Sequence, residues 1–261
     1  MTIRLAHLTD LHFGEAPAAL VDSLSEDVRA QAPDAVLVSG DLSLRARGPE
    51  FAQAWSFLAG LGVPVLAVPG NHDIPPDNLI SRFLHPRRRW LAGMPPDAVQ
   101  ELMLKGISVI GLDTVRRAQW HLDWSAGGVP PSRREALRAV LDSRREARCL
   151  VLCHHPLRHP SGMGHRRLPV GAQAVLALLE AQGVEAVLSG HLHVAALLPG
   201  PGPLQVITPS ALSPRGARPN GWTLLELGMT GIAWRHRAHI DNLWQERDMP
   251  AQRFQTVPAG L

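Results

Sequence analysis

The sequence predicts an α/β (α+β) fold in which a mixed β-sheet system is covered by helices. Three observations support this class. Short apolar runs alternate with longer amphipathic segments through most of the chain, which is typical of strands joined by helices. Consecutive short strands follow residue 200, as in an α+β arrangement. Five of the apolar runs end in polar residues, as expected for strands that carry a ligand site at one sheet edge.

The first part of the chain alternates strictly between strands and helices. Leu20, Leu24 and Val28 share one face of the first expected helix, and Pro49 stands near the start of the second. Residues 75–98 are rich in Pro, Arg and Asp, so we expect an irregular excursion there. A hairpin about Lys105-Gly106 follows. The expected strands are 3–8, 35–38, 63–68, 100–104 and 107–112, and the expected helices are 17–31 and 49–61.

The second part continues this alternation and then changes to strands alone. Helix 132–145 precedes strand 149–152, a loop over 156–169 leads to helix 171–182, and strand 184–188 follows. Strands 204–208, 222–227 and 231–237 come next. Because no repeat or linker divides the chain, we expect one domain over residues 1–261. Its core motifs span 10–193, its closing strands 194–239, and a polar C-terminal tail 240–261.

The composition is that of a folded chain with moderate charge. Of 261 residues, 45% are hydrophobic and 19% are charged, which excludes a disordered polyelectrolyte. The net charge of +3 raises the question of a nucleic-acid or membrane-surface partner. However, Lys105 is the only lysine, and the dispersed arginines accompany many alanines and no tyrosine, as in a codon bias. We therefore expect no stable nucleic-acid partner.

Cysteine usage and the N-terminus bear on the compartment. Cys149 and Cys153 share an apolar, strand-like run, where they would lie roughly 13 Å apart, too far for a disulfide. We expect buried thiols in a reducing compartment. The chain starts with a strand rather than a basic-then-apolar leader, and no apolar run reaches membrane-spanning length. These features predict a cytoplasmic protein without a membrane span.

Polar side chains that can bind metal follow five of the expected strands. Since the carboxyl ends of such strands form a ligand crevice, these side chains are expected to meet there. Core packing would not select these residue types. The clusters are Asp10 with His12, Asp41, Asn71 with His72 and Asp73, His154 with His155, and His191 with His193.

The spacing within the clusters suits metal coordination. Asp10 and His12 are separated by one residue, as are His191 and His193, so an extended backbone directs both side chains of a pair the same way. A glycine precedes three of the clusters and allows the backbone to approach an ion closely. The candidate ligands are Asp10, His12, Asp41, Asn71, His154, His191 and His193.

Seven ligands exceed what one catalytic ion takes, so the sequence predicts two ions. Asp41 stands alone in its segment and is the natural bridge between them. Nitrogen and oxygen donors without a thiolate suit manganese, iron or zinc and do not distinguish among them. Each cluster alone has an ordinary explanation, because Gly, Asn and Asp favour turns. The ordered set of five favours the metal centre.

These motifs resemble, in order, the signature of the calcineurin-like metallophosphoesterase superfamily. The compact size, the His154-His155-Pro156 sequence and the stretch Gly111 to Thr114 are similar to the bacterial class III cyclic-nucleotide phosphodiesterases. The resemblance implies a four-layer fold, in which two mixed β-sheets pack as a sandwich and helices flank them. It also implies a dinuclear metal centre at one edge of the sandwich.

The resemblance further implies a role for each polar residue. One ion takes Asp10, His12, Asp41 and His193, and the other takes Asp41, Asn71, His154 and His191. Of the neighbouring histidines, His154 matches the ligand and His155 supports it. His72 contacts the phosphate or protonates the leaving oxygen, and Asp73 orients His72.

Substrate choice is expected to depend on the loops around the ions. The candidate substrate-binding residues are Arg45, Arg158, His159 and Arg166. The loop 158–167 is the leading candidate because it begins four residues after a metal ligand. For each of these residues, a solvated loop position is the alternative.

The resemblance implies a phosphodiesterase that acts on cyclic nucleotides or similar small phosphodiesters through a hydroxide held between the ions. A phosphomonoesterase, a phospholipid or phosphonate ester hydrolase, and a nuclease remain open on the same site. The presence of His72 argues against a non-catalytic scaffold. The expected partner is a small-molecule phosphodiester, and a homo-oligomer is left open.

Overall fold

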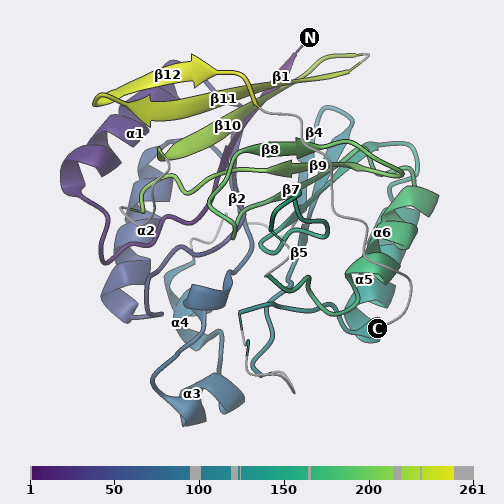
Figure 1. Ribbon diagram of the computed structural model, residues 1–261, viewed down its shortest axis with the longest axis horizontal. Coiled ribbons are helices and arrows are strands. Elements are labelled where there is room, and N and C mark those ends of the chain that lie inside the picture. The colour runs from purple at the N-terminus through teal and green to yellow at the C-terminus, as the bar shows by residue number, and fades with distance from the viewer. Residues whose placement is uncertain are drawn as a thin grey trace.

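The computed structural model describes residues 2–94, 101–118, 123, 125–163, 166–213, 219–229 and 231–249, and two six-stranded sheets dominate it (Figure 1). The first sheet has the order β12-β11-β10-β1-β2-β3. Its strands are β1 (Ile3–Leu8), β2 (Ala35–Val38), β3 (Val65–Ala67), β10 (Gly221–Leu227), β11 (Ile232–Ile240) and β12 (Leu243–Arg247). The strands β1, β2 and β3 run parallel, whereas β10 pairs with β1 antiparallel, so the sheet is mixed.

The second sheet has the order β4-β5-β6-β7-β9-β8. Its strands are β4 (Glu101–Leu104), β5 (Ile107–Leu112), β6 (Arg148–Cys153), β7 (Ala186–Ser189), β8 (Ala196–Leu198) and β9 (Leu204–Ile207). The central strands β5, β6, β7 and β9 are parallel, and the two edge strands pair antiparallel. Both sheets therefore place several parallel carboxyl ends at one edge.

Helices cover the outer face of each sheet. Figure 1 shows α1 and α2 on one side of the molecule and α5 and α6 on the other. Their bounds are α1 (Ala18–Ala30), α2 (Gly48–Gly60), α5 (Pro131–Asp142) and α6 (Ala172–Ala181). Alternate residues of a strand face opposite sides, so Leu5 packs between the sheets and Ala6 packs toward α1 and α2.

Three apolar clusters separate the four layers. One joins α1 and α2 to the first sheet, the second joins the two sheets, and the third joins α5 and α6 to the second sheet. Leu24 belongs to the first cluster, Leu150 to the second and Leu179 to the third, and all three are buried. This order of helix, sheet, sheet and helix confirms the predicted fold class.

The hairpin between β4 and β5 turns at the predicted dipeptide. Lys105 has φ 47° and Gly106 has φ 85°. Positive φ at both central residues is the backbone of a type I′ turn, whose twist matches that of the flanking strands. The turn chemistry thus sets the register in which Leu104 pairs with Ile107.

Residues 75–94 differ from the irregular excursion that we predicted over 75–98, and residues 95–98 lie outside the described residues. Residues 75–94 contain two short helices, α3 (Leu79–Leu84) and α4 (Arg88–Gly93). Trp90 on α4 is buried, and its ring centroid lies 5.3 Å from that of Trp55 and 6.0 Å from that of Phe51. The tertiary anchor provided by this tryptophan outweighs the weak local pattern, which is why the sequence did not indicate a helix.

The C-terminal segment also differs from the prediction, because part of the expected tail is a strand. Asp241 and Asn242, with φ 52° and 60°, form a tight turn that returns β12 onto β11. The indole nitrogen of Trp244 donates to Ser23 Oγ at 3.0 Å, which attaches the strand to α1. The short strand β8 was likewise missed. Residues 250–261 of the expected tail lie outside the described residues.

The prediction of two buried thiols without a disulfide is confirmed, because Cys149 and Cys153 are both free and buried. Burial raises the pKa of the Cys153 thiol to about 12, which keeps it protonated. Among the helices in the described part of the chain, none has the length and apolarity needed to cross a membrane.

Asp27 fastens α1 to the first sheet. Its carboxylate accepts a hydrogen bond from Trp222 Nε1 at 2.9 Å and from Arg237 Nε at 3.1 Å, and a second nitrogen of Arg237 also contacts it. The Arg237 and Asp27 side chains are only 14% and 10% exposed, so this ion pair is shielded from solvent. Removing one partner leaves the other charge buried.

We expect Asp27→Ala to lower the free energy of unfolding by about 3 kcal/mol, because breaking a buried ion pair strands its partner. Urea denaturation followed by circular dichroism measures the change. Asp142→Ala is the matched control, since Asp142 pairs with Arg145 on the surface, where the pair contributes little. Equal midpoints for the two variants would contradict the proposed role of Asp27.

Candidate active site

The five predicted clusters come together at one edge of the sandwich. They follow β1, β2, β3, β6 and β7, whose carboxyl ends lie together because the strands are parallel within each sheet. A cavity of about 600 Å³ opens over them. It is lined by His12, Asp41, Asn71, His72, Ser125, Met163, Arg166, His191, Leu192, His193, Val194, Ser210, Pro219 and Asn220.

The backbone of the paired clusters is not extended as we predicted. Asp10 and His12 have φ 51° and 45°, and His191 and His193 have φ 67° and 53°. This left-handed conformation is uncommon for residues other than glycine. The chain coils tightly past each strand end, and both members of a pair still reach the cluster. The two residues of each pair therefore meet through left-handed backbone rather than through the extended backbone that we predicted.

Asp10 is the centre of a first donor group, by which we mean side chains that could ligate one metal ion. Its Oδ1 lies 3.1 Å from His193 Nε2 and 3.8 Å from His12 Nε2. Its Oδ2 is occupied by protein donors, Thr9 Oγ1 at 2.7 Å and the His191 amide at 3.0 Å. Burial opposes ionisation of Asp10, but the charge of His193 and its hydrogen bond hold the pKa well below the usual range.

Asp41 lies between this group and a second one. Its Oδ2 is 3.8 Å from His12 Nε2 and 3.5 Å from His154 Nε2, while its Oδ1 accepts the His72 amide at 2.8 Å. Asn71 Oδ1 lies 3.0 Å from the same His154 nitrogen. Asp41 Oδ2 thus lies near a candidate metal-ligating nitrogen from each of the two groups.

The His154 ring shows that this arrangement fits metal ions. Its Nδ1 lies 2.7 Å from the Ser39 carbonyl oxygen, which can only accept, so Nδ1 carries the proton. In the neutral ring, Nε2 is then an acceptor, and it faces two further acceptors on Asn71 and Asp41. Lone pairs converge in this way when a cation lies between them, and imidazole, carboxylate and amide suit manganese, iron or zinc.

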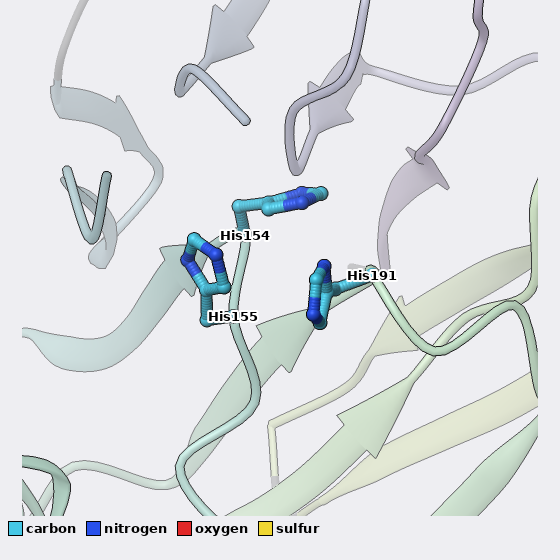
Figure 2. A group of neighbouring side chains, drawn as sticks. All are labelled: His154, His155 and His191. Carbon is cyan, nitrogen blue, oxygen red and sulfur yellow. The ribbon is translucent and has the colours of Figure 1, made fainter. Parts of the chain in front are cut away.

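His155 is held by the protein on both ring nitrogens. Its Nδ1 lies 2.7 Å from Thr114 Oγ1, and its Nε2 lies 2.6 Å from the Ser125 carbonyl oxygen. Figure 2 shows its side chain and that of His154 leaving neighbouring positions in different directions, with His191 arriving from another strand. Its ring centroid is 4.7 Å from that of His191. This geometry favours His154 as the ligand and His155 as its support.

Two glycines allow the strand ends to approach one another. A Cβ on Gly70 would lie 2.1 Å from Asp41 Oδ1, and one on Gly190 would lie 1.9 Å from Thr9 Oγ1. Contacts this short do not occur, so any side chain there would displace Asp41 or Thr9. At these glycines the backbone approaches the side chains of Asp41, Thr9 and Asp10, whereas we had expected it to approach an ion.

His72 lines the cavity, and its Nδ1 lies 2.8 Å from the Leu44 carbonyl oxygen. The expectation that Asp73 orients His72 needs correction, because the His72 ring is held by Leu44 and the hydrogen bonds of Asp73 go to other groups. The Asp73 carboxylate accepts hydrogen bonds from the Gly70 and Ser43 amides at 2.9 Å and joins the loops after β2 and β3. Burial and the charge of Asp41 raise the pKa of Asp73 to about 6.

Of the four predicted substrate-binding residues, the cavity includes Arg166. Arg158 is turned away, since its guanidinium donates to the carbonyl oxygens of Pro201 and Pro203. Arg45 is exposed and His159 is buried, and neither lines the cavity. These three assignments are therefore corrected. Within the loop 158–167, residues 164 and 165 lie outside the described residues.

Sequence reasoning missed several lining residues, of which Ser210 is the most informative. Its hydroxyl donates to the Asp10 carbonyl oxygen at 2.6 Å and accepts the Ser213 amide at 2.9 Å. Ser210 follows β9 closely, so the search for polar residues at strand ends could have found it. Ser125 and Asn220 precede or lie outside strands, and no local signal marks them.

His7 joins the two sheets directly beneath the cluster. Its Nε2 lies 2.8 Å from Ser39 Oγ in the first sheet, and its Nδ1 lies 2.9 Å from Thr208 Oγ1 beyond β9 in the second. Burial lowers the pKa of His7 from 6.5 to about 3, against the opposing charge of Asp10. His7 therefore remains neutral at physiological pH.

Comparison with known proteins identifies the family. The model of the family described as "Calcineurin-like phosphoesterase" matches residues 3–195. The chain belongs to this family. Family membership and the phosphoesterase relatives make the protein a phosphoester hydrolase, and its cluster of histidine and aspartate side chains supplies candidate metal ligands.

Curated relatives of the family align over most of their lengths. A Synechococcus protein named "Probable cyclic nucleotide phosphodiesterase" is 27% identical, covering 95% of this chain and 94% of its own. A Pseudoalteromonas protein of the same description is 29% identical, covering 73% of this chain and 71% of its own. A solved dimetal phosphatase from Danio rerio matches with a TM-score of 0.63 at 15% identity, covering 95% and 99% of the two chains. That structural likeness shows the shared fold.

We expect stability to fall as the pH drops from 6.5 toward 3, because the unfolded chain then binds a proton that folded His7 does not. In metal-free protein, His7→Gln removes this contribution, which is about 2 kcal/mol between pH 7.5 and 5.0. Urea unfolding at both pH values measures it. An equal pH-dependent loss in wild type and variant would contradict the neutral state of buried His7.

Proposed function

We propose that this phosphoesterase is a dinuclear-metal-dependent phosphodiesterase acting on cyclic nucleotides or similar small phosphodiesters. The position of Asp41 carries the proposal. Its Oδ2 lies within 3.8 Å of a histidine nitrogen from each donor group, as a carboxylate shared by two ions requires. The names of the two curated relatives support the choice of a cyclic-nucleotide substrate.

The donors divide into two ligand sets that share Asp41. We assign Asp10, His12, Asp41 and His193 to one ion, and Asp41, Asn71, His154 and His191 to the other. When bound, two such ions polarise the phosphoryl oxygens and make a water nucleophilic at neutral pH. The hydrogen bonds from Thr9 to Asp10 and from His154 to Ser39 hold these ligands in place before any ion binds.

His72 is positioned to move a proton. The Leu44 carbonyl oxygen holds Nδ1, which leaves Nε2 as the atom that can serve a bound molecule. In the imidazolium form both nitrogens carry protons. Nε2 can then donate to the oxygen that leaves phosphorus. The ring stands edge-on to His12, with centroids 4.9 Å apart, so it is adjacent to the first ligand set.

The remaining cavity wall suits a nucleotide. A volume of about 600 Å³ is in the range of small-molecule sites. Leu192, Val194 and Pro219 present an apolar surface to a flat base or sugar, and Arg166 offers a bidentate donor to a phosphate. This combination of an apolar wall and one guanidinium supports a substrate that is part anion and part ring.

We expect Asp41→Ala to abolish metal-stimulated hydrolysis of bis(p-nitrophenyl) phosphate and to reduce the bound metal measured by inductively coupled plasma mass spectrometry. Loss of the shared carboxylate removes a ligand from both ions. Asp142→Ala, which alters an exposed carboxylate, is the control and should retain both properties. Wild-type turnover in the Asp41 variant would rule out the proposed centre.

We expect His72→Asn to lower kcat/KM for a 3′,5′-cyclic nucleotide by about 10²–10⁴-fold, because its alkoxide leaving group needs a proton. The loss should be much smaller with p-nitrophenyl esters, whose leaving group departs as a stable anion. His85→Asn, an exposed histidine, is the control. Equal losses for both substrates would exclude proton donation by His72.

The substrate class is tested by comparing kcat/KM for a cyclic nucleotide, a linear diester, a phosphonate ester and a nucleoside monophosphate on metal-loaded protein. We expect the cyclic nucleotide to be preferred over the monoester. A preference for the monoester would replace the phosphodiesterase proposal while leaving the metal centre intact.

A further inference from the structure

A second cavity of about 550 Å³ lies outside the candidate active site. It opens between α3, the loop after β5 and the start of α5. Its lining residues are Ile74, Phe83, Leu84, Pro86, Arg87, Val115, Arg116, Arg117, Ala118, Pro130 and Arg133. None of these described residues also lines the first cavity, so the two spaces are separate.

Positive charge gathers in this second cavity. Four of its lining residues are arginines, and none of the lining residues that the structure describes is acidic. Asp113, which is not among the lining residues, pairs with Arg87 and Arg133. The four arginines of the lining thus have one carboxylate beside them, which pairs with two of them and leaves a net positive charge around the cavity.

Two of the arginines are fixed by the protein. Arg133 donates to the carbonyl oxygens of Asp113 at 2.7 Å and Val115 at 3.0 Å. Arg87 contacts the Asp113 carboxylate, and its Nη1 is buried without a hydrogen-bond partner among the described residues. A buried donor left unpaired is costly, so the Arg87 guanidinium keeps a hydrogen-bonding group that Asp113 does not satisfy.

Arg116 is held by packing rather than by charge. The aliphatic part of the Arg116 side chain packs against Gly128, since a Cβ added to Gly128 would lie 2.6 Å from Arg116 Cδ. Its guanidinium has no hydrogen bond or ion pair within the described part of the chain. Burial lowers the pKa of Arg133, Asp113 opposes that shift, and the charges of Arg87, Arg116 and Arg117 add to it. The like charges thus lie close enough to repel one another.

We propose that this second cavity is an anion site that binds the phosphate group of a small molecule. Guanidinium groups donate in pairs to phosphate oxygens, and two anchored arginines with an unpaired Arg116 present such donors without rearrangement. Phe83, Leu84 and Pro86 form an apolar side of the same cavity, which suits a phosphorylated molecule with an organic body. The site is independent of the metal centre.

The phosphate can belong to a free small molecule or to a lipid headgroup. The lipid is relevant because Leu84 and Ile80 on α3 beside the cavity are 65% and 74% exposed. Both sources supply the same chemistry to the arginines. The experiment therefore uses inorganic phosphate in one arm and vesicles containing phosphatidic acid in the other.

The test is calorimetric titration of the full-length, metal-free protein, so that phosphate cannot bind to metal. Arg116→Gln is the test variant, because the glutamine keeps the first part of the side chain, which packs on Gly128, and removes the guanidinium. Arg138→Gln removes the same charge from an exposed position on α5, and Arg166→Gln removes it from the first cavity. We expect Arg116→Gln to weaken binding at least tenfold and Arg138→Gln to bind as wild type, whereas Arg166→Gln reports any phosphate that binds in the first cavity instead.

A loss confined to Arg116→Gln supports the site, and the arm in which it occurs identifies free phosphate or lipid as its source. If Arg116→Gln binds like Arg138→Gln in both arms, the proposal is overturned. It is also overturned if Arg166→Gln abolishes binding while Arg116→Gln does not. Because the protein is metal-free, neither result depends on the phosphodiesterase activity.

Discussion

The arrangement of the candidate active site depends on the contact between Asp41 and the backbone at Gly70. Asp41 follows β2 and Gly70 follows β3, and no side chain would fit between them. This contact directs one carboxylate oxygen to the His72 amide and leaves the other for both donor groups. Asp73 then closes the same two loops with hydrogen bonds to Gly70 and Ser43. The candidate ligands that follow β2 and β3 are thereby held relative to one another by contacts within the first sheet.

Much of this arrangement could be predicted from the sequence, because strand ends and ligand chemistry leave local signals. The apolar runs, the type I′ turn at Lys105-Gly106 and the five polar clusters are all readable from neighbouring residues. Other features depend on partners far along the chain. Trp90 makes α4 a helix only by packing against Trp55, and Arg158 faces carbonyl oxygens some forty residues away. No local pattern reports such contacts.

The fold also concentrates positive charge that is dispersed along the sequence. In the sequence the arginines look dispersed, and a net charge of +3 indicates little about a partner. Folding brings Arg87, Arg116, Arg117 and Arg133 from three separate segments into one cavity, where Asp113 compensates only part of their charge. Local potential, rather than net charge, thus determines where an anion would bind.

The left-handed backbone at the candidate metal-ligand positions lowers the stability of the fold. Asp10, His12, Asp41, His191 and His193 all adopt positive φ, which costs roughly 1–3 kcal/mol per residue and persists only when the surrounding fold enforces it. Glycine or asparagine would relieve this cost at each position. Selection for thermostability alone would therefore favour replacing these candidate metal ligands, and only selection for turnover would retain them.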